Sequence, residues 1–386
     1  MTLRHVKTPN PASDFAWKID SNGGVSIVKL LNRDALEIVV PSEIDGRPVG
    51  AVEFRAFSEP AAVKSLTLPD SLQRVAEEAF FNCQSLETLD LPLTSPRLFP
   101  RELALCESFA DENTPPEMYA LGKRAFAGCS ALKTLTIPAG WEGLGESAFT
   151  DCISLETLVL PDSLKALGPC AFKGCSSLNA VTFGRNLEKI DRESFADCKS
   201  LKTLTLPDGL RVVDVAAFRN CEALTSVVFP PFLASLSTHA FENCASLTSV
   251  ELPDSTTDIS AAFSGCQALE KIRLPRGLKR LEHFAFWYCS ALRDVKLPLE
   301  LETIGDDSFH GCASLAELVF PEGFKEVGNA AFCGCSSLRK LTFPASLEKI
   351  GDRAFTKCAP DLTFCGPVGS FVEKYARKKK RPFEAI

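Results

Sequence analysis

The sequence predicts an α/β solenoid, in which short coils stack on one another and share a continuous core. A motif of the form C-x-x-L-x-x-L-x-L-P-x-x-L-x-x-I-x-x-x-A-F-x-x-C recurs along the chain, for example at residues 152–175, 198–221 and 312–335. From Cys83 to Cys358 its Cys recurs every 23 residues, with one interval of 22 residues. A coil this short cannot enclose its own apolar face, so neighbouring coils must cover one another.

The first expected element of each coil is a short β-strand, as in the segment LKTLTLP at residues 201–207. Leu204 and Leu206 alternate with Thr203 and Thr205, which is typical of a strand with one buried face. The Pro that follows has no N–H to donate, and the sequences PDG and PDS favour a turn. We therefore expect parallel strands, one per coil, that end before this Pro.

Two further elements complete the expected coil. A pair of apolar residues three apart, such as Leu164 and Leu167, predicts a second extended segment. The A-F-x-x-C segment predicts a helical turn that ends on a residue able to adopt the left-handed backbone region. Residues of this kind precede the Cys in many repeats: Gly174, Asp197, Asn220 and Asn243.

The pattern divides the chain into three segments. Residues 1–35 are expected to form an N-terminal lead and cap, and residues 36–366 a single solenoid of about 14 coils. Residues 367–386 are expected to form a capping helix and tail, with Ser370 as the helix cap. This helix would dock on the last coil through Phe371, Val372 and Tyr375, and the basic residues 378–381 suit its C-terminal end.

Composition and charge exclude several classes of partner. Hydrophobic residues at 45% and charged residues at 24% are typical of globular proteins. The net charge of -7 is scattered, so we expect no nucleic-acid partner. Without an apolar run of about 18 residues we expect no membrane insertion. Thirteen of the sixteen Cys occupy one repeat position, which favours buried, reduced thiols over a disulfide framework.

The repeats resemble those of the BspA-type leucine-rich repeat proteins, whose units have the pattern L-x-x-L-x-L-P-x-x-L-x-x-I-G-x-x-A-F-x-x-C. The resemblance covers about residues 36–386; residues 38–52 are similar to the family's opening unit and residues 369–386 to its closing segment. It implies a right-handed leucine-rich repeat solenoid. Members are commonly bacterial or protist surface proteins that bind host or matrix proteins, so the resemblance implies binding rather than catalysis.

Functional residues are expected where a coil departs from the chain's own consensus, because the regular coils are interchangeable. Residues 93–122 lack the strand pattern although Cys106 keeps the spacing, which favours a decayed repeat over a protruding loop. The coil at residues 251–266 is one residue short and has Thr256 at a core position. We expect the stack to bend or loosen there.

The strongest departure is the segment LEHFAFWYCSAL at residues 281–292. Phe286 is the core Phe of its repeat, whereas Trp287 and Tyr288 occupy positions that are polar in other coils, and Phe284 also falls outside the core pattern. Two interpretations stay open. The aromatic residues fill a gap left by the short coil, or they form a partner-binding site of the kind that exposed Trp and Tyr provide.

Other candidates follow from the stacking. The 23-residue period places His310 and Cys333 in the column of Trp287. On the outer strand face, hydroxyl residues give way to charged residues over residues 270–296. The expected partner-binding residues are Phe284, Trp287, Tyr288, His310, Cys333, Arg273 and Lys296.

Catalysis is the less favoured hypothesis. A thiol-dependent enzyme would use Cys333 and His310, but no carboxylate in the same column orients the His and no oxyanion loop is recognisable. No Cys-x-x-Cys pair and no common catalytic or nucleotide-binding motif occurs. We therefore expect no metal and no cofactor.

The sequence thus predicts a non-enzymatic protein-interaction module with a protein partner. The alternative is a bacterial surface adhesin whose signal peptide has been removed. The N-terminus lacks the apolar segment of a secretory signal. A cytoplasmic location is expected if residue 1 is the native start, and a cell-surface or secreted location if a signal was trimmed.

Overall fold

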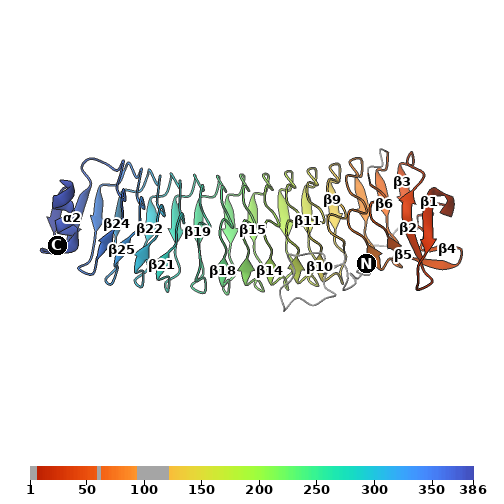
Figure 1. Cartoon of the computed structure of the whole chain (residues 1–386), viewed down its shortest axis with the longest axis horizontal. Helices are drawn as coiled ribbons and strands as arrows, with labels where there is room; N and C mark the ends of the chain where they lie inside the picture. The colour runs from red at the N-terminus through yellow and green to blue at the C-terminus, as the bar shows by residue number, and fades with distance from the viewer. Residues whose placement is uncertain (1–6, 59–61, 94–120) are drawn as a thin grey trace. The chain divides into compact units, whose positions relative to one another are not determined.

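The computed structural model describes residues 7–58, 62–93 and 121–386. Its contacts divide the chain into two compact units, residues 1–201 and residues 202–386. Each unit contains stacked coils whose short strands pair in parallel with the strands of the neighbouring coils (Figure 1). The predicted solenoid with parallel sheets is therefore confirmed in both units.

Unit 1 begins with a sheet that joins two hairpins to the first coils. The hairpins are the antiparallel pairs β1–β2 and β4–β5. Strand β5 links them to the coils, because it pairs in parallel with both β2 and β7. Strands of three residues and strands of two residues then alternate along the chain, and they correspond to the two extended segments predicted for each coil. The elements of unit 1 are η1 (Ala12–Asp14), β1 (Phe15–Ile19), β2 (Val25–Leu30), β3 (Glu37–Val39), β4 (Glu43–Ile44), β5 (Arg47–Val52), β6 (Ser65–Thr67), β7 (Arg74–Val75), β8 (Thr88–Asp90), β9 (Thr134–Thr136), β10 (Gly143–Leu144), β11 (Thr157–Val159), β12 (Ala166–Leu167), β13 (Ala180–Thr182) and β14 (Lys189–Ile190).

Unit 2 repeats the same alternation and ends in a helix and a last strand. Its three-residue strands form the sheets β15–β17, β19–β20–β22 and β24–β26–β28–β29, and its two-residue strands include the ladder β21–β23–β25–β27. The elements of unit 2 are β15 (Thr203–Thr205), β16 (Val212–Val213), β17 (Ser226–Val228), β18 (Ser235–Leu236), β19 (Ser249–Glu251), β20 (Lys271–Arg273), β21 (Arg280–Leu281), β22 (Asp294–Lys296), β23 (Thr303–Ile304), β24 (Glu317–Val319), β25 (Glu326–Val327), β26 (Lys340–Thr342), β27 (Lys349–Ile350), β28 (Thr363–Gly366), α2 (Phe371–Lys379) and β29 (Phe383–Ala385).

The strands are built as the sequence predicts. In β15 the side chain of Leu204 is buried while Thr203 and Thr205 are exposed. The register between neighbouring strands equals the repeat, since Thr157 of β11 pairs with Thr134 of β9 and with Ala180 of β13. At the short coil the register drops to 22 residues, with Ser249 opposite Lys271.

The segment before each Cys forms tight turns rather than regular helix. In the coil that ends at Cys152, the N–H of Thr150 donates to the carbonyl of Ser147 and the N–H of Cys152 donates to that of Phe149, which are three-residue steps. The predicted left-handed residues are confirmed, with φ of 75° at Gly174 and 58° at Asn220. A second left-handed position lies four residues earlier, as at Cys170 with φ of 57°, and the sequence did not predict it.

A column of Phe and a column of Cys form the core. In unit 2 the Phe rings stack at centroid distances of 5.2 Å between Phe218 and Phe241, and the distance widens to 6.3 Å between Phe263 and Phe286, beside the short coil. Each thiol donates to a Phe carbonyl of the neighbouring coil, as from Cys312 Sγ to the oxygen of Phe286 at 3.2 Å. The cysteines of the described residues are free, and those of the repeat position are buried.

The C-terminal segment covers the last coil. Ser370 caps α2 by accepting a hydrogen bond from the N–H of Glu373, and Val372 and Ala376 are fully buried. Phe371, which was expected to dock, is instead 37% exposed because it lies on the outer side of the first turn. An unpredicted strand, β29, follows the helix and pairs in parallel with β28.

The irregular segment at residues 93–122 falls almost entirely outside the described residues, so neither the decayed repeat nor the loop is tested. Its two flanks are nonetheless neighbours. The N–H of Phe80 donates to the carbonyl of Ala125 at 2.8 Å, and the Phe80 and Phe126 rings stack at 4.7 Å. The coil that ends at Cys83 therefore contacts the coil that ends at Cys129 directly.

Candidate functional site

The segment at residues 282–289 divides its aromatic residues between the core and the surface. Phe286 is completely buried in the Phe column, as predicted. The exposed fractions of Phe284, Trp287 and Tyr288 are 44%, 37% and 46%. These three residues and His310 are called the aromatic cluster below.

Three members of the aromatic cluster, Trp287, Tyr288 and His310, contact one another across two coils. The Trp287 and Tyr288 rings meet edge to face with centroids 4.3 Å apart, and the Tyr288 ring lies 5.4 Å from the His310 ring. The backbone fixes this arrangement, because the N–H of Tyr288 donates to the carbonyl of His310 at 2.7 Å. The Tyr288 ring covers Gly311, where an added Cβ would lie 2.9 Å from the ring.

The predicted column of Trp287, His310 and Cys333 is present. The N–H of Gly311 donates to the carbonyl of Cys333 at 2.8 Å, which sets the coil of Cys333 beside that of His310. The Cys333 side chain is partly exposed, whereas the thiols of the repeat position are buried. Whether these residues bind a partner stays a prediction.

The backbone of the aromatic cluster is unusual for its residue types. Phe284 and Tyr288 occupy the two left-handed positions of their coil, with φ of 58° and 55°. In the other coils that the structure describes, neither position holds Phe, Tyr or Trp. A side chain with a Cβ costs about 1–2 kcal/mol in this region relative to right-handed backbone, and bulky residues are rare in it.

A carboxylate that the sequence analysis missed orients His310. Asp307 Oδ1 lies 2.7 Å from His310 Nδ1, and both side chains are about one quarter exposed. The sequence analysis looked for a carboxylate only among the residues stacked above and below His310 in neighbouring coils. Asp307 lies in the same turn as His310, three residues earlier. No hydrogen bond joins His310 to Cys333 among the described residues, and no cluster of three metal-ligating side chains occurs in that part of the chain.

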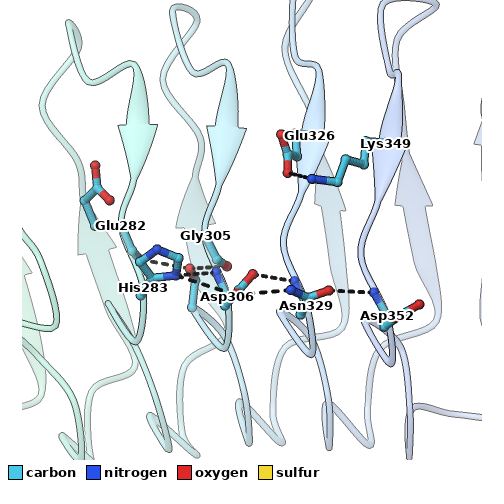
Figure 2. Close-up of polar contacts among 9 residues, drawn as sticks. Glu282, His283, Gly305, Asp306, Glu326, Asn329, Lys349 and Asp352 are labelled. Carbon is cyan, nitrogen blue, oxygen red and sulfur yellow. Dashed lines mark hydrogen bonds and ion pairs between the residues drawn. The ribbon is translucent and has the colours of Figure 1, made fainter.

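A ladder of polar side chains holds the turn that carries Phe284 (Figure 2). His283 Nδ1 accepts a hydrogen bond from the N–H of Asp306 at 2.9 Å, and Asp306 Oδ1 accepts from the N–H of Asn329 at 2.7 Å. Asn329 Oδ1 in turn accepts from the N–H of Asp352 at 2.8 Å. Each side chain satisfies a backbone donor of the next coil, so this ladder is structural and positions the neighbouring aromatic cluster.

The short coil leaves a gap, but the aromatic cluster does not fill it. Thr256 is buried and its hydroxyl donates to the carbonyl of Leu233, which explains how a polar residue replaces Leu at this position. The second strand of this coil is reduced to a single bridge between Ser235 and Asp258. A hollow of about 450 Å³ opens beside it, lined by Thr257, Asp258, Ile259, Ser260, Gly277, Lys279, Arg280 and Glu282. Neither Trp287 nor Tyr288 lines this hollow, and the choice between local packing repair and partner-binding site stays a prediction.

Arg273 and Lys296 line a second surface, called the charged groove below. It is a hollow of about 920 Å³ over the strand face of β17, β19, β20 and β22. Arg273 pairs opposite Lys296 in the sheet, donates to the carbonyl of Leu252 at 2.8 Å and forms an ion pair with Asp254 at 3.2 Å. The lining residues are Ser226, Val227, Ser249, Val250, Glu251, Lys271, Ile272, Arg273, Leu274, Arg276, Asp294, Lys296, Leu297, Pro298, Leu299 and Glu300.

Two features of the charged groove suit contact with another molecule. Lys271 and Lys296 have no acidic group within ion-pair distance among the described residues, so their charges are available. Leu299 is 85% exposed at the rim. The sequence indicated the charges of this face, but it gave no signal for the hollow.

Coils of about 23 residues with one parallel strand each, a core of Leu, Phe and Cys columns, and outward surfaces on the turns and strands define a leucine-rich repeat protein. The chain belongs to the family described as "BspA type Leucine rich repeat region (6 copies)", whose model matches residues 46–156, 142–261 and 236–362. The resemblance inferred from the sequence is thereby confirmed.

Several solved structures have the same fold. A leucine-rich repeat protein from Bacteroides ovatus is 24% identical with a TM-score of 0.71, and the match covers 99% of this chain and 100% of that chain. A leucine rich cell surface protein from Faecalibacterium prausnitzii is 22% identical with a TM-score of 0.53, covering 97% and 98% of the two chains. The pneumococcal vaccine antigen PcpA is 19% identical with a TM-score of 0.52, covering 98% of each chain.

A search of the curated proteins found no significant match. Similar structures thus include a bacterial cell-surface protein, and at these identities the likeness establishes the fold alone. Among the described residues, no helix has the length and apolar character needed to cross a membrane.

Proposed function

We propose that the chain is a non-enzymatic protein-interaction module whose aromatic cluster is the main contact surface for a protein partner. The observation that carries the proposal is the exposure of three large aromatic side chains in one turn, two of them at left-handed backbone positions. Trp and Tyr dominate the energetics of protein interfaces because they bury a large area and freeze few rotors. The left-handed positions recur in the other described turns, so the aromatic residues at them, and not the backbone itself, set this coil apart.

The charged groove is the second contact surface in this proposal. Rim charges such as Lys296 chiefly affect the association rate and its salt dependence rather than the total affinity. The two surfaces therefore have different kinetic signatures. Changes in the aromatic cluster should raise the dissociation rate, whereas Lys296→Ala should lower the association rate most strongly at low ionic strength.

Binding is favoured over thiol catalysis by the geometry of the aromatic cluster. His310 is bonded to Asp307, and the Cys333 thiol makes no hydrogen bond to the imidazole among the described contacts, so nothing there activates the thiol. The test of this part is alkylation of Cys333 with iodoacetamide. We expect partner binding to respond to the added bulk, and a hydrolase or transferase activity that disappears on alkylation would contradict the proposal.

The central experiment compares the native chain with Trp287→Ala/Tyr288→Ala. Because both rings are largely outside the core, the free energy of unfolding should change by about 1 kcal/mol or less. Affinity for the partner recovered from the source lysate should fall by about 2 kcal/mol or more, as measured by calorimetry. Phe232→Ala is the matched control, because Phe232 is 63% exposed on another coil of unit 2 and should leave binding unchanged.

Two outcomes would oppose this assignment. A loss of several kcal/mol in unfolding free energy would mean that the rings are structural, since that is the cost of removing large core side chains. Unchanged affinity in the double variant, with reduced affinity in Phe232→Ala, would place the interface elsewhere.

The alternative setting is a surface adhesin. One similar structure is described as a leucine rich cell surface protein. Mass spectrometry of the mature N-terminus from the source cells separates the settings. A processed terminus in the envelope fraction supports the adhesin, and an unprocessed terminus in the cytosolic fraction supports an intracellular module.

A further inference from the structure

A small cavity lies between the last coil of unit 2 and the capping helix α2. Its volume is about 220 Å³, below the roughly 300–1,000 Å³ of sites for drug-sized ligands, so it suits one compact chemical group. The buried rings of Phe355 and Phe364 border it, together with the half-buried Tyr375. The lining residues are Arg353, Ala354, Phe355, Thr356, Phe364, Tyr375, Lys379 and Arg381.

The charge of the lining is entirely positive. Arg353 comes from the last coil, whereas Lys379 and Arg381 lie at and just after the end of α2, and no acidic residue is among the lining residues. Arg353 and Lys379 have no acidic group within ion-pair distance in the described residues. Lys379 instead lies 5.9 Å above the Tyr375 ring.

Arg381 is fixed in place by the backbone. Its Nη1 donates to the carbonyls of Ala359 and Pro360 at 2.7 and 3.0 Å, which orients the guanidinium at the cavity. The pKa of the Tyr375 hydroxyl is raised, mainly by burial, so this group stays protonated and can donate a hydrogen bond.

The surroundings of the cavity are positive on balance, although the negative charge of Asp352 also acts on Tyr375 and helps to raise the pKa of its hydroxyl. Residues 353–386 contain eight Lys or Arg and three Asp or Glu, whereas the whole chain has a net charge of -7. The C-terminus of a helix carries about half a negative charge, which opposes an anion. Three full positive charges at the cavity outweigh it.

We propose that this cavity binds a tetrahedral oxyanion, either phosphate or sulfate, as a free ion or as the end of a larger molecule. Two guanidinium groups, an ammonium group and the hydroxyls of Thr356 and Tyr375 supply the donors that such an oxyanion requires. The site is independent of the aromatic cluster, so it does not rest on the proposed protein-binding function.

The experiment titrates the full chain with inorganic phosphate, inorganic sulfate and phenyl phosphate at constant ionic strength, with chloride as the competing anion. Lys379→Gln and Arg353→Gln each remove one lining charge, and Lys378→Gln is the matched control because it removes the same charge from α2 outside the cavity lining. We expect saturable binding that is weakened about tenfold by each lining variant, as for a lost charge-assisted hydrogen bond. Lys378→Gln should weaken it less than about twofold, because an exposed charge outside the site is screened.

Comparing the three ligands also shows whether the cavity prefers a free oxyanion or one attached to a larger molecule. Tighter binding of phenyl phosphate than of inorganic phosphate would support a phosphate group attached to an apolar body that contacts the aromatic border. If all three variants weaken oxyanion binding equally, the anion is attracted by the general positive charge and not by this cavity, and the proposal is wrong. Binding of an oligonucleotide without saturable binding of any small oxyanion would also overturn the proposal. Melting temperatures of the variants check that each one is folded. If Arg353→Gln is unstable, the test is whether Lys379→Gln weakens oxyanion binding more than Lys378→Gln does.

Discussion

At the scale of single residues, the left-handed backbone positions distinguish Phe284 and Tyr288 from their equivalents in other coils. The position before the Cys holds Gly, Asn or Asp in the described coils, except for Tyr288 and Lys357. Gly adopts this conformation without strain and Asn tolerates it by hydrogen bonding locally, whereas an aromatic residue has no such compensation. Phe284 and Tyr288 are therefore poor choices for stability, which is consistent with the proposed role of these exposed side chains in binding.

Replacing Tyr288 by Asn gives the coil the residue that unit 2 has at Asn220 and Asn243. Relief of backbone strain and loss of the ring contact with Gly311 have opposite signs, so the unfolding free energy should change by about 1 kcal/mol or less. Binding of the partner should weaken about tenfold or more. Chemical denaturation and calorimetry on the same preparation measure both; a variant that is strongly destabilised and still binds would show that Tyr288 is structural.

The limits of prediction at this scale follow from local backbone geometry. The burial of Phe286 and the exposure of Trp287 could be predicted because repetition identifies the inward position of each coil. The contact between Asp307 and His310 could not, because it depends on Asp307 adopting φ of 54° within the turn. The 23-residue repeat predicts which side chains of neighbouring coils lie above one another. It does not predict which side chains meet within a single turn.

At the scale of elements, each coil is held to the next by stacked Phe rings. The Phe195 ring is completely buried and lies 5.5 Å from that of Phe172. Phe195→Ala should lower the unfolding free energy by about 3–5 kcal/mol, because removing a large core side chain leaves a cavity. Phe232→Ala, at an exposed position, should lower it by less than about 1 kcal/mol. Urea unfolding followed by circular dichroism compares them, and equal effects would contradict the role of the Phe column.

The capping element makes a second prediction. Deleting residues 367–386 removes α2 and β29, which exposes the face that Val372 and Ala376 cover and leaves the edge of β28 unpaired. The truncated protein should therefore aggregate or melt at a lower temperature, as solenoids without a cap do. Light scattering and thermal melts test this. Normal melting with complete loss of partner binding would mean that the segment is a binding site rather than a cap.

Elements could be predicted where alternation, Pro and turn residues fix them, as in β15 and α2. The expected helical turns are replaced by three-residue steps, because two left-handed positions in each turn leave too short a run for helical hydrogen bonds, as at Cys170 and Gly174. The expectation for the segment around Cys106 lies outside the described residues, although its flanks meet through the Phe80 and Phe126 rings. β29 was not predicted because its three residues have no repeat partner in the sequence.

At the scale of the whole molecule, repetition makes the fold predictable and leaves the site uncertain. Core columns recur in every coil, so each repeat is an independent observation of the same structure. In the part of the chain that the structure describes, the aromatic cluster, the charged groove and the proposed oxyanion cavity depend on side chains that the other coils do not share. The family match conveys the shared core, whereas the proposed partner contacts lie at the departures from it.

The Cys column gives the whole molecule an unusual dependence on pH. Burial raises the pKa of Cys266 to about 12 and that of Cys358 to about 11, and it also raises the pKa of Cys289 and Cys312. In the unfolded chain a thiol has a pKa of about 8.5. Above that pH the unfolded chain loses protons that the folded chain keeps, so the stabilising contribution is complete below about pH 8.5 and declines as the pH rises toward the folded values.

Stability should therefore fall steeply on the alkaline side. Each thiol whose pKa burial raises removes about 1.4 kcal/mol of unfolding free energy per pH unit between its unfolded and folded pKa. Cys266, Cys289, Cys312 and Cys358 each contribute such a loss, whereas the hydrogen bonds that Cys129 receives from Cys152 and Cys83 lower its pKa, so that it does not. Urea unfolding between pH 7 and pH 10.5 in the presence of a phosphine reductant measures the slope. Cys266→Ala should be less stable than the native chain at pH 7, because it leaves a small cavity, and its alkaline slope should be shallower by about one thiol's share. Stability that stays constant up to pH 10.5 would contradict this prediction. It would mean that the thiols lose their protons in the folded chain at the same pH as in the unfolded chain.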